Sequence, residues 1–172
     1  MTFLLAHLSD IHLPPLPALQ RRDFFGKRLI GYLNWKRGRE RLHSAKILQK
    51  LTADLNAQNP DHIALTGDLT NLALGAEFER MQGWLRAFTF AEKLSIIPGN
   101  HDAYVDGALD EGVGFLADWL PRKPKAADAF PYVHERGKIA LIGLSSAIAT
   151  PPFIAAGEIG AEQLHRLANI LN

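Results

Sequence analysis

The chain has 172 residues, of which 47% are hydrophobic and 22% charged, the balance of an ordinary globular domain. Because 19 basic residues nearly cancel 18 acidic ones, the net charge is +1, and no overall field attracts nucleic acid or an anionic membrane. The sequence contains no cysteine, which excludes disulfides, thiolate metal sites and cysteine nucleophiles. It shows no secretory signal and no apolar stretch of about 18 residues, so we expect a soluble, cytoplasmic protein.

Short apolar runs alternate with helical patterns along the chain. The runs predict strands at Phe3–Leu8, His62–Leu65, Leu94–Ile97 and Ile139–Leu144. Apolar residues spaced by three or four predict helices over Arg39–Ala57, from about Ala76 to Phe88, around Val113–Leu120, and over Gly160–Asn172, the last packed on a sheet. The segment from Lys123 to Pro131 is predicted to be a loop. This β-α-β-α-β order predicts an α/β fold with a largely parallel sheet.

Short polar motifs follow the first three predicted strands. Asp10-Ile11-His12 follows the first, Gly67-Asp68 the second, and Gly99-Asn100-His101-Asp102 the third. Each motif alone is explained by an ordinary strand end or turn. Because ligands bind at the carboxyl edge of parallel sheets, however, we expect the three motifs to converge on one site.

The donor types indicate divalent metal ions. Asp10 and His12 are two residues apart, so in an extended chain both side chains point to the same face and can hold one ion. Asp68 and Asn100 add oxygen donors. Imidazole, carboxylate and amide ligands without sulfur favour manganese, iron, zinc or nickel over a structural zinc site. One carboxylate shared by two ions would hold them about 3.5–4 Å apart, the spacing that clamps phosphoryl oxygens.

The three motifs, in this order and each after an apolar strand, resemble those of the calcineurin-like metallophosphoesterases, and the resemblance extends over essentially the whole chain. It implies a β-sandwich flanked by helices in four layers (α/β/β/α). It also implies a hydrolase with a dinuclear metal site, in which Asp10 and His12 ligate the first ion, Asp68 bridges both ions, and Asn100 ligates the second.

The resemblance also implies how such a site works. A hydroxide that bridges the two ions would attack phosphorus in line. His101 would protonate the leaving oxygen or stabilise charge on the phosphoryl group, and Asp102 would orient the imidazole of His101.

Related sites contain further histidines: one after a later strand and two in a Gly-His-x-His motif. The sequence shows neither feature. His134 lies in a segment predicted to be a hairpin turn, and His165 lies within the last predicted helix, so both are poor substitutes. We therefore expect residues 1–172 to be the truncated, N-terminal portion of a single metallophosphoesterase domain, and we expect the isolated chain to be an incomplete catalyst.

Residues 13–38 form a basic, aromatic insertion after the first motif. Between residues 21 and 41 there are eight basic and two acidic residues, so the remainder of the chain is net acidic. Three interpretations stay open: a docking surface for an anionic substrate, contact of residues 21–41 with a membrane surface, or a structural segment whose aromatics pack on the sheet. Nucleic acid is disfavoured, since these aromatics could equally belong to the core.

The sequence thus predicts a metal-dependent phosphoric ester hydrolase with two divalent ions as cofactors. A phosphodiesterase acting on a small phosphate ester or nucleotide is the preferred interpretation. A pyrophosphatase acting on a lipid-linked nucleotide is the alternative that the insertion favours, and a catalytically incomplete binding module is the non-enzymatic alternative. The identity of the metals, the substrate and the oligomeric state stay open.

Overall fold

The computed structural model describes residues 2–88, 91–121 and 126–172. The strands are β1 (Leu5–Ser9), β2 (His62–Thr66), β3 (Leu94–Ile97), β4 (Tyr132–Arg136) and β5 (Ile139–Gly143). The helices are α1 (Lys27–Asn34), α2 (Glu40–Leu42), α3 (Ala45–Gln58), α4 (Gly75–Phe88), α5 (Ala108–Phe115), α6 (Ala126–Ala129) and α7 (Ala161–Leu171). Short helical turns are η1 (Arg21–Phe24), η2 (Trp35–Arg39) and η3 (Ala91–Lys93).

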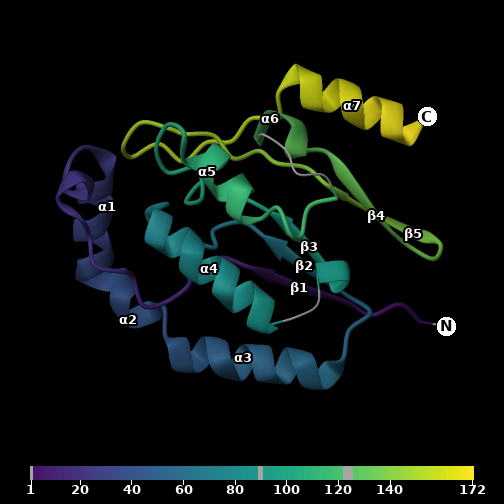
Figure 1. Cartoon of the computed structure of the whole chain (residues 1–172), viewed down its shortest axis with the longest axis horizontal. Coiled ribbons are helices and arrows are strands. Elements are labelled where there is room, and N and C mark those ends of the chain that lie inside the picture. The colour runs from purple at the N-terminus through teal and green to yellow at the C-terminus, as the bar shows by residue number, and fades with distance from the viewer. Residues whose placement is uncertain (1, 89–90, 122–125) are drawn as a thin grey trace.

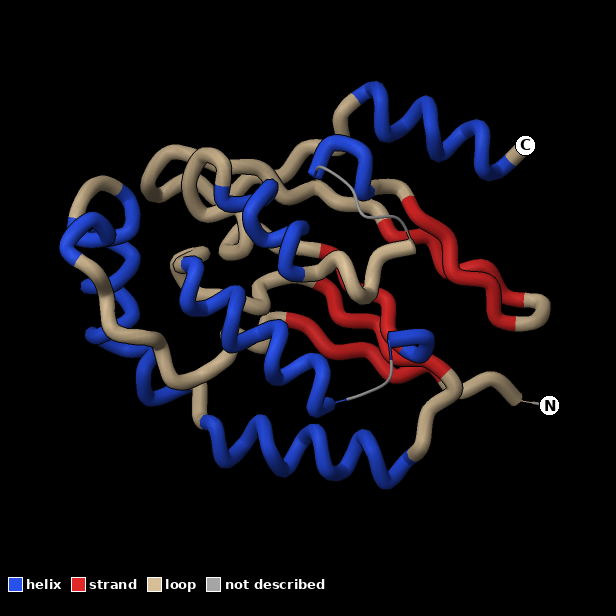
Figure 2. Tube along the Cα trace, viewed as in Figure 1, coloured by secondary structure: helices blue, strands red, loops and turns tan. Residues whose placement is uncertain are grey.

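Two sheets form the β-structure of the described residues. β1, β2 and β3 pair in parallel in that order, and β4 and β5 form an antiparallel hairpin. The carboxyl ends of β1–β3 lie at the end of the molecule that holds α1, and α3 and α7 lie on opposite sides (Figure 1). The loops that follow the strands gather at this same end (Figure 2). The mixed α/β class is confirmed, whereas the four-layer sandwich and the truncation stay predictions.

The core lies between the parallel sheet and α4. Alternate residues of a strand share a face, so Ile63 and Leu65 of β2 point to the same side as Ile96 of β3, and all three are at most 2% exposed. On α4, Phe78 and Leu85 are at most 1% exposed and belong to the same cluster. Each such side chain contributes about 1.5–3 kcal/mol by leaving water, which fixes the strand ends relative to the helices.

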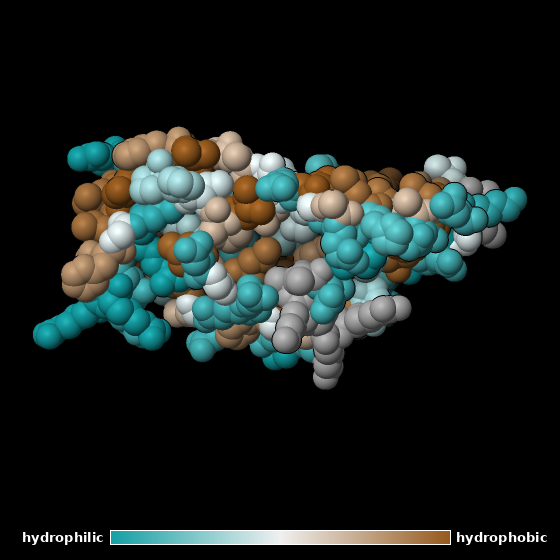
Figure 3. All heavy atoms as spheres, turned by 90° about the horizontal axis from the view of Figure 1, so that it is seen from above, coloured by the Kyte–Doolittle hydropathy of each residue, from teal (hydrophilic) through white to brown (hydrophobic). Residues whose placement is uncertain are grey.

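The other face of the parallel sheet is covered in part. The β4–β5 hairpin attaches to it through the hydroxyl of Tyr132, which donates to the Ile96 carbonyl oxygen at 2.8 Å. On the edge strand β1, however, Leu5 is 44% exposed and His7 is also exposed. Exposed apolar side chains interrupt the hydrophilic surface along the length of the molecule (Figure 3). None of the described helices is long and apolar enough to cross a membrane.

Four predictions of secondary structure were wrong in detail. The predicted helix over Arg39–Ala57 is interrupted at residues 43–44, where the backbone leaves the helical region before α3 begins. His134 lies within β4 and not in a turn, because the hairpin turn falls at Gly137. The helix α7 buries none of its residues, so it does not pack on a sheet as expected. The predicted loop at 123–131 contains α6, and its residues 123–125 lie outside the described residues.

Candidate metal centre

The loops after the three parallel strands are held together by backbone hydrogen bonds. The Asp10 N–H donates to the Gly67 carbonyl at 3.2 Å, and the His12 N–H donates to the Asp68 carbonyl at 2.8 Å. The Gly67 N–H in turn donates to the carbonyl of Ile97 at 2.9 Å. The polar motifs therefore converge as predicted.

The backbone at these motifs is not extended. Asp10, His12 and Asp68 have φ values of 54°, 42° and 51°, in the left-handed region that side-chain-bearing residues rarely adopt. The prediction that Asp10 and His12 share a face by strand alternation was therefore wrong in its reason, because β1 ends at Ser9. Such strained positions cluster at functional sites, where the surrounding structure holds the side chains in place.

His12, Asp68 and His101 form a cluster whose potential ligand atoms all lie within 4.8 Å of one another. His12 Nε2 lies 3.8 Å from an Asp68 carboxylate oxygen, and His12 Nδ1 lies 2.9 Å from the Thr70 carbonyl oxygen. Since a carbonyl accepts, Nδ1 carries the proton and Nε2 presents a lone pair toward Asp68. Burial, with the nearby His101 second, lowers the pKa of His12 to about 4, so its imidazole is neutral near pH 7.

Asp68 is fixed from its other side by the chain that carries His101. The His101 backbone N–H donates to Asp68 Oδ1 at 2.8 Å, which leaves Oδ2 facing His12. Gly99 allows this approach: a Cβ atom on Gly99 would lie 2.2 Å from Asp68 Oδ1 and 2.4 Å from its backbone nitrogen. Gly67 has a φ of +80° and supplies the turn before the carboxylate. These two glycines therefore allow the loops after β2 and β3 to approach each other closely.

Asp10 and Asn100 lie beside this cluster. Together with Asp68 they line a cavity of about 370 Å³ at the carboxyl edge of the sheet, which we call the carboxylate cavity. Asp10 is exposed and Asn100 half-buried, so both are open to a ligand. The four predicted metal ligands thus surround one region, although the tightest cluster contains His101 in place of Asp10 and Asn100.

Asp102 has a different role from the predicted one. Its carboxylate is 3% exposed and accepts hydrogen bonds from the backbone N–H groups of Leu69, Thr70 and Gly99, at 3.2, 2.8 and 2.9 Å, and from the Thr70 hydroxyl at 2.9 Å. It therefore joins two strand-end loops and does not orient the His101 ring.

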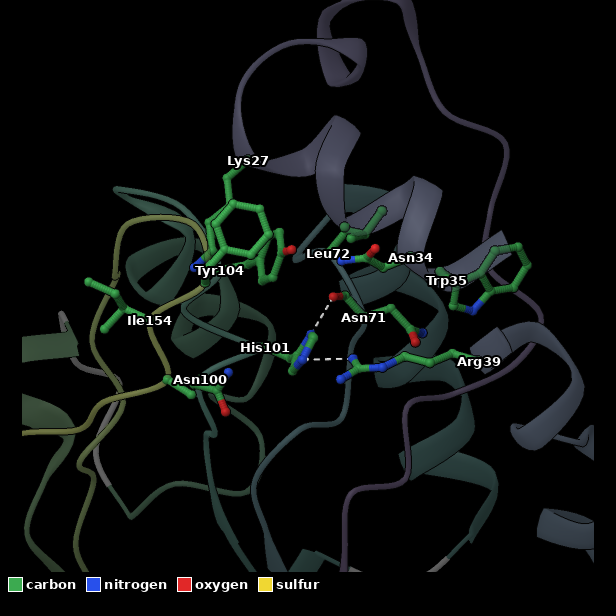
Figure 4. Close-up of a pocket in the computed structure, with 13 residues that line it drawn as sticks. Lys27, Asn34, Trp35, Arg39, Asn71, Leu72, Asn100, His101, Tyr104 and Ile154 are labelled. Carbon is green, nitrogen blue, oxygen red and sulfur yellow. Dashed lines mark hydrogen bonds between the residues drawn. The ribbon is translucent and has the colours of Figure 1, made fainter. Parts of the chain in front are cut away.

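The His101 ring is held by other groups. Its Nδ1 lies 2.6 Å from the carbonyl oxygen of Asn71, and its Nε2 lies 2.8 Å from Nη1 of Arg39 (Figure 4). Because a carbonyl only accepts and a guanidinium only donates, this arrangement requires a neutral ring with its proton on Nδ1. The Asn71 carbonyl thus does what was predicted for Asp102, since it fixes the orientation and the tautomer of the imidazole.

Two residues of the site were missed by sequence reasoning. The His43 ring centroid lies 4.7 Å from that of His12, and burial together with Arg39 and His101 lowers the pKa of His43. His43 sits at the break between α2 and α3, which the continuous apolar spacing across Leu42 and Ala45 concealed. Arg39 was noted only as one of several basic residues, and no pattern singled it out.

The basic insertion is attached to the site. Arg28 donates to the carbonyl oxygens of Leu72 and Ala73, at 3.1 and 2.5 Å, and pairs with buried Asp23 at 3.4 Å. These carbonyls belong to the loop that follows Asp68. The arm, as we call residues 20–39, therefore packs beside the metal ligands, and Trp35 is 8% exposed within it.

The two histidines considered as substitutes lie elsewhere. His134 Nδ1 lies 3.0 Å from the Ser95 hydroxyl, and that hydroxyl lies 2.7 Å from His62 Nε2, near the amino ends of the parallel strands. His165 lies on α7, where its ring contacts Asn169. Neither belongs to the cluster at the carboxyl edge.

A family model described as calcineurin-like phosphoesterase matches residues 3–172. The chain therefore belongs to the calcineurin-like phosphoesterase family, whose members are metal-dependent phosphoester hydrolases. The predicted family is confirmed. A comparison with curated protein sequences finds no significant match.

Proposed function

We propose that the chain is a phosphodiester hydrolase that binds two divalent metal ions at the carboxyl edge of its parallel sheet. The observation that carries this proposal is the cluster of His12, Asp68 and His101, whose potential ligand atoms lie within 4.8 Å of one another beside the carboxylate cavity. Membership of the family supports the reaction class, and the cluster supports the place where it occurs.

The donor set fits divalent ions. His12 is neutral and directs the lone pair of Nε2 toward the Asp68 carboxylate. Metal coordination requires a neutral imidazole and a deprotonated carboxyl group. Asp10, His12 and Asp68 would hold the first ion, and Asp68 and Asn100 the second. Nitrogen and oxygen donors without sulfur suit manganese, iron, zinc or nickel. When bound, such ions polarise phosphoryl oxygens and make hydroxide available near neutral pH.

The protein groups around the cluster have separate tasks. Asp102 holds the loops of Asp68 and Asn100 at a fixed spacing through its four accepted hydrogen bonds. His101, fixed through Nδ1 by the Asn71 carbonyl, presents Nε2 to the leaving oxygen of a substrate. In the absence of substrate, Nε2 accepts from Arg39. A substrate phosphate that draws Arg39 away frees the Nε2 lone pair, so that Nε2 can take up a proton from solvent and pass it to the leaving oxygen.

Metal dependence can be tested on the purified chain. The protein is stripped with EDTA and reloaded with Mn²⁺, the bound metal is measured, and hydrolysis of bis(p-nitrophenyl) phosphate is followed. We expect metal-dependent hydrolysis, and we expect Asp68→Asn to lose bound metal and at least about 100-fold in rate, because removal of outer-shell partners alone costs 10–100-fold. Asp54→Asn, at an exposed position of α3, is the matched control. Equal hydrolysis in EDTA, or in Asp68→Asn, would refute the assignment.

The second candidate is a metal-binding module without full catalytic power. It is favoured by the small number of ligands for the second ion. Among the described residues, His134 and His165 lie away from the cluster and add no imidazole to that ion. The same experiment separates the two functions. Stoichiometric metal binding without turnover of the phosphodiester supports the module, whereas turnover that follows metal loading supports the hydrolase.

A further inference from the structure

A second cavity, of about 260 Å³, lies between the arm and the strand-end loops, and we call it the arm cavity. One wall is formed by α1 and η2, and the other by the loops after β2 and β3, with residues 153–155 at the side (Figure 4). It shares Asn100 and Ala155 with the carboxylate cavity. A ligand can therefore extend from one cavity into the other.

Two cations from the arm reach the two ends of a short aromatic stack in this cavity. The His101 and Tyr104 rings are stacked with their centroids 5.3 Å apart. Arg39 donates to Nε2 of His101, and Lys27 Nζ lies 4.4 Å from the centroid of the Tyr104 ring. Lys27 also donates to the Thr150 hydroxyl at 3.2 Å. Figure 4 shows Arg39 directed at His101 and Lys27 beside Tyr104, at opposite ends of the stack, and both side chains line the arm cavity.

Among the described residues, neither cation has a carboxylate partner. No acidic residue lines the arm cavity, and neither Lys27 nor Arg39 forms an ion pair with a carboxylate in the part of the chain that the structure describes. Nearby basic residues differ, since Arg28 pairs with Asp23 and Lys36 with Glu40. Partial burial lowers the pKa of Lys27, which shows that its ammonium has lost part of its hydration. Two unpaired cations in a semi-enclosed cavity favour an anionic ligand.

The arm that carries these cations is packed closely on the site. A Cβ atom on Gly31 of α1 would lie 2.3 Å from the Tyr104 hydroxyl oxygen and 2.6 Å from a methyl carbon of Leu72. Together with the Arg28 bonds to the backbone, this contact fixes α1 against the loop after β2. The cations are therefore held at a set distance from the metal ligands, which a recognition site requires.

We propose that Lys27 and Arg39 form an anion subsite that binds a second phosphate group, carried by the leaving group of the substrate. The placement of the leaving group in the arm cavity rests on the proposed function. In that function His101, which lines the arm cavity, faces the leaving oxygen. The anion subsite itself does not depend on hydrolysis. A cavity of about 260 Å³ is smaller than the 300–1,000 Å³ of most ligand pockets and suits a compact charged group.

The reaction balances with this arrangement. Water would add to the phosphorus beside His12 and Asp68, which would hold an ion there, and the P–O bond to the leaving oxygen would break with its electron pair on that oxygen. Once Arg39 has moved to the phosphate, His101 Nε2 takes up a proton from solvent and passes it to the leaving oxygen, and the attacking water releases one proton to solvent. The leaving group departs with its second phosphate intact, while Lys27 and Arg39 hold that phosphate during the bond cleavage.

The subsite can be tested without metal and without turnover. Inorganic phosphate is titrated into the EDTA-treated chain at low ionic strength, and the heat of binding is measured by calorimetry. We expect Lys27→Met and Arg39→Gln each to weaken phosphate binding about tenfold, the effect of losing one charge-assisted hydrogen bond. Lys46→Met and Arg41→Gln, which change exposed cations outside the cavity, are expected to bind as the wild type does. Circular dichroism confirms that all four variants are folded.

The outcomes separate this proposal from the proposed function. Absence of phosphate binding, or equal weakening in the Lys46 and Arg41 variants, would overturn the anion subsite. Hydrolysis of bis(p-nitrophenyl) phosphate, whose leaving group carries no second phosphate, tests the metal-dependent reaction alone. A chain that hydrolyses this ester with metal but shows no phosphate binding through Lys27 and Arg39 is a phosphodiesterase without the subsite.

Discussion

Replacing Asp102 with asparagine is expected to separate the strand-end loops and to destabilise the whole domain. The Asp102 carboxylate is 3% exposed, and burial raises its pKa to about 6, so it is ionised at pH 8. One oxygen accepts from the backbone N–H groups of Leu69 and Gly99, and the other accepts from the N–H and hydroxyl of Thr70. An asparagine side chain has one acceptor oxygen, so its NH₂ group must face N–H donors.

The cost follows from these contacts. The Thr70 hydroxyl can rotate away, but at least one buried backbone N–H loses its acceptor and meets a second donor. A buried unsatisfied donor costs about 1–3 kcal/mol, and a lost hydrogen bond to a charged group costs about 1.5–3 kcal/mol. We therefore expect Asp102→Asn to lower the free energy of unfolding by about 3 kcal/mol, a large part of the 5–15 kcal/mol typical of a domain.

Urea denaturation of the metal-free protein at pH 8, followed by circular dichroism, measures this difference. Asp106→Asn is the matched control, because Asp106 is exposed and only four residues away in the sequence. A loss below about 1 kcal/mol in Asp102→Asn, similar to the control, would show that the buried carboxylate does not hold the loops together. In that case the role expected from the sequence, in which Asp102 orients the His101 imidazole, would have to be considered again.

Three further changes probe the core, the arm and the far end of the sheet. Phe78→Ala, at a side chain 1% exposed, is expected to lower the free energy of unfolding by about 3–5 kcal/mol in urea denaturation, and a loss below about 1 kcal/mol would contradict its place in the core. Gly31→Ala would place a methyl group 2.3 Å from the Tyr104 hydroxyl, so trypsin is expected to cleave residues 20–39 faster than in the wild type; an unchanged rate would argue against close packing of α1. Burial, and to a smaller extent the neighbouring Arg136 and His134, lowers the pKa of His62 to about 4. Because the unfolded chain takes up this proton near pH 6.5, the fold has its full stability above pH 6.5 and loses part of it as the pH falls toward 4. Between pH 7 and pH 5 the free energy of unfolding, measured by denaturant titration, is expected to fall by about 2 kcal/mol. His62→Gln is expected to remove this part of the pH dependence.

The parts of the fold that could be predicted are those in which local pattern and burial agree. β2 and β3 are short apolar runs buried beneath helices, and their observed bounds differ from the predicted ones by at most one residue. The convergence of the Asp10, Asp68 and Asn100 motifs followed from one rule, that parallel strands present their carboxyl ends at one edge. The strands depend on residues that lie close together in the sequence, and the convergence of the distant motifs follows once these strands pair in parallel.

The parts that could not be predicted depend on contacts between distant segments. β4 contains His134, Glu135 and Arg136 in succession, a polar run typical of a turn, and only pairing with β5 makes it a strand. The hydrogen-bond acceptor of the His101 ring could not be chosen from sequence, because the Asn71 carbonyl lies 30 positions away in the chain whereas Asp102 is the next residue. Likewise, spacing alone does not show that Arg39 reaches His101 across 62 positions of the chain.

The attachment of the arm by Arg28 has a consequence for how selectivity can change. The acceptors of Arg28 at positions 72 and 73 are main-chain carbonyls, so the anchorage does not depend on which side chains occupy those positions. Lys27, which we propose binds a phosphate of the substrate, therefore lies on a segment separate from the proposed metal ligands and joined to their loop through the backbone. Changes elsewhere in the arm that keep Arg28 and the close contact at Gly31 are expected to leave the arm in place, so that substrate preference can change separately from the residues of the metal centre.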